Sequence, residues 1–85
     1  MSEMMKIVAV PIEAIYVPQK LRKPLDPKAV ESLAESIVEI GQQSPILVRR
    51  DKERFVLVSG LHRLEACRLL GETTIKANIV QATKH

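Results

Sequence analysis

The stretch FVLVSGLHR, from Phe55 to Arg63, decides the fold of this chain. Its first four residues are all apolar, so they predict a strand that is buried on both faces. Ser59 and Gly60 interrupt this strand, and the residues from Leu61 to Leu70 predict a helix that Gly71 closes. A strand therefore runs through a Ser-Gly turn directly into the N-terminus of a helix.

This turn has the chemistry of an anion site. The first turn of a helix carries amides without internal partners, and the helix dipole adds partial positive charge. Gly60 allows close approach to the backbone, and Ser59 offers a hydroxyl. His62 can donate a hydrogen bond, and Arg63 can hold phosphate oxygens with its forked guanidinium. We therefore predict a phosphate-bearing ligand here. The structural alternative is that Ser59 only caps the helix and Arg63 forms a surface ion pair, for example with Glu65.

The rest of the chain predicts one helix and three strands around this unit. A helix begins at Asp26-Pro27, because Asp caps free amides and Pro suits the first helical position, and it ends at Gly41. Runs rich in Val and Ile predict strands over residues 6–12, 45–49 and 74–80. The segment 13–25 carries prolines and basic residues, and we expect it to be an extended, exposed connector. The predicted order is β-α-β-β-α-β.

Composition limits the functional classes. The 85 residues suffice for a single domain, which we expect to span residues 1–85 with its core at about 6–81. Aromatic residues make up only 2% of the chain, which argues against a stacking platform for single-stranded nucleic acid. The net charge of +3 suits a phosphate-bearing partner. A basic cluster either contacts nucleic acid or is simply solvated: Lys20, Arg22, Lys23 and Lys28.

The remaining signals concern the compartment and metals. Cys67 is the only cysteine, so the sequence supports neither a disulfide framework nor a multi-cysteine zinc site. No metal site is expected from the spacing of His62 and His85. No apolar run approaches the length of a membrane span, and there is no signal-peptide pattern, so we expect a cytoplasmic protein without membrane contact.

The first predicted helix carries a second set of polar candidates. Ser32 and Ser36 are four residues apart and share one face, with Lys28 one turn earlier. A cation and two hydroxyls on one face suit the phosphates or ribose of a nucleotide. The alternative is an exposed polar face without a ligand.

Taken together, these runs resemble the ParB/sulfiredoxin superfamily over about residues 8–83. The likeness rests on five runs in fixed order: residues 25–27, residues 30–37, Gly41, Pro45-Ile46, and residues 59–63 with Ala66. It implies an α+β fold in which helices pack on a small mixed sheet. It also implies a nucleotide, ATP or CTP and possibly with Mg²⁺, held by Gly60, the backbone of Leu61, His62 and Arg63. Ser32 and Ser36 match positions that sulfiredoxins use for the nucleotide.

Leu61 departs from both branches of the superfamily. Sulfiredoxins have their catalytic cysteine at this position, and ParB proteins usually have Glu there. An aliphatic side chain supplies no nucleophile, so we expect no sulfinic-acid reduction and assign no catalytic residue. Cys67 lies among Leu64, Ala66 and Leu70, and we expect it to be a core residue. The sequence also ends before the ParB helix-turn-helix, so we expect no centromere binding of the full ParB kind.

Three functional hypotheses follow. The first is a stand-alone nucleotide- or phosphate-binding module with a regulatory role. The second is an ATP-dependent enzyme of kinase or nuclease type, for which Glu13 is a candidate acid or base. The third is a ParB-related adaptor for DNA or for a protein partner, with the basic connector on the phosphates. The sequence favours the first, because it keeps the phosphate turn and lacks the reactive group.

Overall fold

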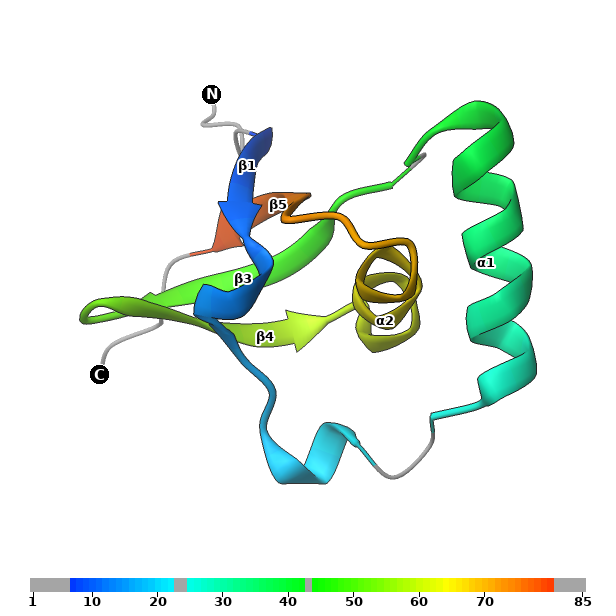
Figure 1. Ribbon diagram of the computed structural model, residues 1–85. Helices are drawn as coiled ribbons and strands as arrows, with labels where there is room; N and C mark the ends of the chain where they lie inside the picture. Colours follow the sequence, from blue (N-terminus) through cyan, green and yellow to red (C-terminus); the bar gives the residue numbers. More distant parts are fainter. Residues whose placement is uncertain (1–6, 23–24, 43, 81–85) are drawn as a thin grey trace.

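A five-stranded mixed sheet and two α-helices make up the chain (Figure 1). The computed structural model describes residues 7–22, 25–42 and 44–80, so Lys6, Lys23 and Gln81 lie outside the described residues. The elements are β1 (Ile7–Pro11), the 3₁₀ turn η1 (Ile12–Ala14), β2 (Ile15–Tyr16), the 3₁₀ turn η2 (Gln19–Leu21), α1 (Pro27–Ile40), β3 (Ile46–Asp51), β4 (Arg54–Ser59), α2 (Leu61–Leu69) and β5 (Thr74–Val80).

The sheet mixes parallel and antiparallel neighbours in the order β1-β5-β3-β4-β2. The β1–β5 and β3–β4 pairs are antiparallel, whereas the β3–β5 and β2–β4 pairs are parallel. Figure 1 shows α2 between the sheet and α1, with α1 running across the outside of α2. This arrangement confirms the predicted α+β class with a small mixed sheet.

The core lies between α2 and one face of the sheet. Leu64, Ala66 and Cys67 of α2 are buried. They face an aliphatic sheet surface made by alternate residues of the strands, because successive side chains of a strand point to opposite faces. The sheet residues of this core are Val10, Ile46, Val48, Leu57, Ile75 and Ala77. The packing of α2 on this surface fixes where the helix begins, and hence where the predicted phosphate turn lies.

Helix α1 follows its predicted limits closely. The side chain of Asp26 accepts a hydrogen bond from the Lys28 amide at 3.1 Å, and Pro27 occupies the first helical position. Gly41 ends the helix with a φ of 82°, a conformation that favours glycine. The start and stop signals in the sequence therefore act as predicted.

The prediction for the connector was wrong in part. It was expected to be extended and exposed, but it contains two 3₁₀ turns and the short strand β2, which pairs with β4. Ile15 and Val17 are each only 7% exposed and belong to the core. The alternation of apolar residues at Ile15 and Val17 outweighs the local effect of the prolines, because burial of these side chains stabilises the fold.

The prediction that Phe55–Val58 is buried on both faces was also wrong in part. Val56 and Leu57 are buried, but Phe55 is half-buried and Val58 is 41% exposed. The helices cover only one face of the sheet (Figure 1). Within the described residues, no helix is long and apolar enough to cross a membrane.

Candidate functional site

The predicted phosphate turn lies where β4 passes into α2. Gly60 is the N-cap residue of α2 and has a φ of 110°. A Cβ atom at this position would lie 2.7 Å from Cγ2 of Ile46 and 2.9 Å from its Cβ. Glycine is therefore required both by the backbone conformation and by the close approach of this turn to β3.

The first turn of α2 presents unpaired amides. No side chain caps the helix, and the first amide bonded back along it is that of Leu64, which donates to the Gly60 carbonyl at 2.9 Å. In the described part of the chain, the amides of Leu61, His62 and Arg63 have no hydrogen-bond partner. Ser59 is the last residue of β4 and exposed, so the alternative in which Ser59 caps the helix is wrong.

Arg63 is available for an anion. The expected ion pair with Glu65 does not form, because Glu65 instead pairs with Arg68 at 3.5 Å. Among residues 7–22, 25–42 and 44–80, Arg63 has no ion-pair or hydrogen-bond partner, and it is half-buried. Arg63 and the three free amides belong to the same first turn of α2, and both kinds of group are suited to phosphate oxygens.

His62 connects the N-termini of the two helices. Its Nε2 accepts a hydrogen bond from the Asp26 amide at 2.9 Å. The N-cap of α1 therefore lies against the first turn of α2, so two helix ends with partial positive charge are adjacent. His62 was predicted as a donor to the ligand. Its Nε2 is engaged as an acceptor, which leaves Nδ1 as the nitrogen that can donate.

The two serine candidates lie farther along α1. Ser32 is exposed and Ser36 is half-buried. At 1.5 Å of rise per residue, they lie about 9 and about 15 Å along the helix from Asp26. They share the helix that carries the second N-terminus, but nothing tests their contact with a nucleotide, and their role stays a prediction.

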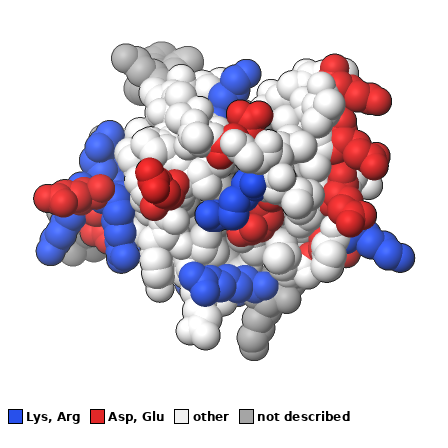
Figure 2. Space-filling view, in the orientation of Figure 1, with Lys and Arg blue, Asp and Glu red and all other residues white. Residues whose placement is uncertain are grey.

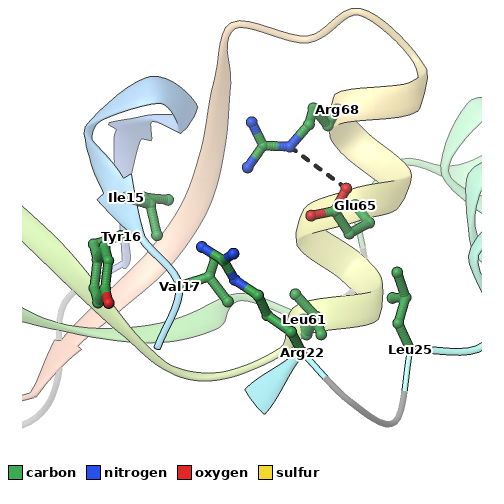
Figure 3. A pocket seen from close by; sticks show the side chains of 8 residues that line it. All are labelled: Ile15, Tyr16, Val17, Arg22, Leu25, Leu61, Glu65 and Arg68. Carbon is green, nitrogen blue, oxygen red and sulfur yellow. Dashed lines mark ion pairs between the residues drawn. The ribbon is translucent and has the colours of Figure 1, made fainter. Parts of the chain in front are cut away.

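Leu61 forms the wall of a neighbouring cavity instead of supplying a reactive group. The cavity has a volume of about 360 Å³ and lies between the side of α2 and five residues that precede α1 (Figure 3): Ile15, Tyr16, Val17, Arg22 and Leu25. Leu61 also packs against the core. The sequence did not indicate this cavity, because Ile15, Arg22 and Arg68 meet there only through the tertiary fold.

Cys67 is a core residue, as predicted. It is 3% exposed and free, and it packs in the main cluster. Burial raises the pKa of its thiol above the ordinary value of 9.0, Glu72 raises it further, and Arg63 opposes the shift. Its burial and its raised pKa make Cys67 a poor substitute for a catalytic cysteine.

The described residues contain no group of three His, Cys, Asp or Glu side chains that could hold a metal ion. Of the basic cluster, Lys20 and Lys28 are exposed and Arg22 lines the cavity beside Leu61.

Comparison with known proteins places these features in a family. The ParB N-terminal domain model matches residues 1–85. Over 62 residues the chain is 40% identical to a probable chromosome-partitioning protein ParB of Campylobacter jejuni, a match that covers 73% of this chain and 22% of that protein. It is also 38% identical over 78 residues to a chloroplastic/mitochondrial sulfiredoxin of Arabidopsis thaliana, covering 92% of this chain and 62% of that protein.

Solved structures show the same fold. The crystal structure of the Arabidopsis thaliana sulfiredoxin has a TM-score of 0.83 at 37% identity, covering 92% of this chain and 88% of that chain. A C-terminally truncated chromosome-partitioning protein ParB from Caulobacter crescentus, complexed with CTP-gamma-S, has a TM-score of 0.80 at 26% identity, covering 93% of this chain and 46% of that chain. The five-strand mixed sheet, the glycine turn into α2 and the match over the whole sequence agree: this chain belongs to the ParB N-terminal domain family, within the ParB/sulfiredoxin superfamily.

Proposed function

We propose that this chain is a nucleotide- or phosphate-binding module that holds the phosphates of CTP or ATP at the first turn of α2. The observation that carries the proposal is the set of three unpartnered amides at residues 61–63, in the same turn as Arg63, whose guanidinium has no ion-pair partner among the described residues. Free amide donors and the positive end of the helix dipole favour a polyphosphate over a neutral ligand. The ParB relative complexed with CTP-gamma-S supports a nucleotide as that polyphosphate.

In this proposal the α2 amides and Arg63 bind the phosphates, and Nδ1 of His62 donates to them. Ser32 and Ser36 contact the rest of the nucleotide from α1. Any Mg²⁺ is held by phosphate oxygens and water, because the described residues offer no acidic cluster for it. The role is regulatory rather than catalytic, since Leu61 brings no nucleophile to the turn.

The test is calorimetric titration of wild type and of Arg63→Gln with CTP, ATP and inorganic triphosphate. Loss of a charge-assisted contact predicts an affinity at least about tenfold lower in Arg63→Gln. Arg54→Gln is the matched control, because Arg54 lies on the β3–β4 hairpin and pairs with Asp51 at 3.2 Å. Equal binding by wild type and Arg63→Gln, or no binding at all, would contradict the proposal.

A further inference from the structure

In the described part of the chain, the sheet has one long free edge. The strand order puts β1 at one margin and β2 at the other, and β2 has only two residues whereas β1 has five. Figure 1 shows β1 on the side of the molecule away from α1. Edge strands usually resist pairing with another chain through charged side chains or a bulge. The sequence of β1, IVAVP, carries no charge, and its register with β5 is regular.

A hydrogen bond at the end of β1 shows which of its residues bond to β5. In an antiparallel pair, only alternate residues exchange hydrogen bonds with the partner strand. The Ile12 amide donates to the Thr73 carbonyl at 3.0 Å, and these two residues continue the register of the β1–β5 pair. Val8 and Val10 have the same phase as Ile12, so their backbone groups point towards β5.

The backbone groups of Ile7, Ala9 and Pro11 therefore point away from the sheet. Lys76, the register partner of Ala9, agrees with this phase: its amide donates to Oε1 of Gln42 at 2.9 Å, and its carbonyl accepts from Nε2 at 3.0 Å. Among residues 7–22, 25–42 and 44–80, the outward groups of β1 have no hydrogen-bond partner. The edge offers the amides of Ile7 and Ala9 and the carbonyls of all three residues, because proline has no N–H.

This pattern is complementary to itself. When a second β1 lies antiparallel, with Ala9 opposite the Ala9 of the copy, each Ala9 amide meets the other Ala9 carbonyl. Each Ile7 amide then meets a Pro11 carbonyl, so the missing donor of Pro11 affects only the last position of the pair. Ile7, which is 59% exposed, comes to lie opposite Pro11, and Val8 opposite Val10. Such aliphatic cross-strand pairs stabilise a sheet, and the uncharged strand brings no like charges together.

We propose that β1 is a dimerisation edge, at which two copies of this chain pair antiparallel with Ala9 on the two-fold axis and join their five-stranded sheets into one. An isologous contact closes on itself, so the assembly ends at two copies. A single strand pair is smaller than a standard interface, so the dimer is weak and forms at about 0.1–1 mM chain. Arg63→Gln should dimerise like wild type, because β1 has no residue in the first turn of α2.

The first test is amide hydrogen exchange of wild type at about 0.05 mM and about 1 mM, with sedimentation velocity at both concentrations. Exchange at Ile7 and Ala9 should slow at least about twofold at the higher concentration, as a dimer appears in sedimentation. Val8 and Val10 should change less, because they already bond to β5. A monomer at the higher concentration, or protection that grows at Tyr16 of β2 instead, would overturn the proposal.

Charge variants at Ala9 test the two-fold pairing. Ala9→Lys and Ala9→Glu each place like charges opposite one another, so each should stay monomeric where wild type dimerises. An equimolar mixture should recover the dimer, because unlike charges then meet across the axis. Val38→Lys is the matched control, at an exposed side chain of α1, and should dimerise like wild type. Amide spectra verify the fold of each variant.

Two further results would contradict the pairing. A mixture of folded Ala9→Lys and Ala9→Glu that stays monomeric would show that Ala9 does not lie on the axis. Protection of Ile7 and Ala9 in wild type that sediments as a monomer would show that this edge is covered within one copy. The wild-type measurements decide even if a charge variant does not fold.

Discussion

Gly60 is held by two separate constraints, its φ of 110° and its contact with Ile46. Gly60→Ala should lower the free energy of unfolding by about 2–4 kcal/mol, because it adds left-handed backbone strain and a clash in the core. Gly71→Ala is the control: Gly71 has a φ of 79° but open space around it. It should lose only about 1–2 kcal/mol. Urea denaturation measures the free energy of unfolding of both variants. Equal losses would show that the close contact with Ile46 does not add to the destabilisation.

Cys67 should make stability depend on pH in the alkaline range. Burial raises the pKa of the folded thiol above 9.0, so the unfolded chain ionises first as pH rises. The stability that the neutral thiol contributes is present below the unfolded pKa and is lost above it. Cys67→Ala should cost about 1 kcal/mol near neutral pH, from lost burial.

The pH test compares urea midpoints of wild type and Cys67→Ala at about pH 7 and about pH 9.5. Tyrosine and lysine titration is common to both proteins, so the difference isolates the thiol. Wild type should lose more stability than Cys67→Ala between the two pH values. A larger loss in Cys67→Ala would contradict the direction of the pKa shift.

At the scale of elements, the start of α1 depends on its cap. The Asp26 carboxylate accepts from the Lys28 amide, and the Asp26 amide donates to His62. Asp26→Ala should lower the free energy of unfolding by about 1 kcal/mol, whereas Asp26→Asn should be nearly neutral, since Asn caps equally well. Thermal or urea unfolding distinguishes them. Similar losses in both variants would mean that charge, not capping, matters at Asp26.

The connector is an element that local signals could not predict. Its prolines indicate extended backbone, yet its role is set by distant partners: β2 pairs with β4, and Ile15 packs in the core. Ile15→Ala should lower the free energy of unfolding by about 2–4 kcal/mol. Ile7→Ala, at a side chain that is 59% exposed, should cost less than about 1 kcal/mol. If urea denaturation shows that Ile15→Ala lowers the free energy of unfolding only slightly, the connector does not contribute to the core.

At the scale of the whole molecule, the features that could be predicted from the sequence are those that residues adjacent in the chain determine. The caps at Asp26 and Gly41, the burial of Cys67 and the passage from β4 through Gly60 into α2 all rest on local chemistry. The hydrogen bond from Asp26 to His62 joins residues 36 apart, and the cavity beside Leu61 gathers three segments, so neither has a local pattern.

Acidic side chains gather along α1, away from the first turn of α2. In Figure 2 acidic side chains line the edge where Figure 1 shows α1, and Glu31, Glu35 and Glu39 are exposed on that helix. Ser32 and Ser36 lie beside this acidic stripe, whereas Arg63 lies at the start of α2. Negative charge on α1 disfavours a phosphate there, so we expect the phosphates at α2 and only uncharged parts of a nucleotide at the serines.

The most direct measurement is an amide NMR titration of the chain with CTP and with ATP, using inorganic triphosphate as the phosphate-only arm. We predict that every ligand that binds shifts the amides of residues 60–63 first and most, because the phosphates bind there, and that Arg63→Gln weakens these shifts. If no ligand moves these amides at millimolar concentration while the protein stays folded, or if the largest shifts lie on the β3–β4 hairpin, the central claim is wrong.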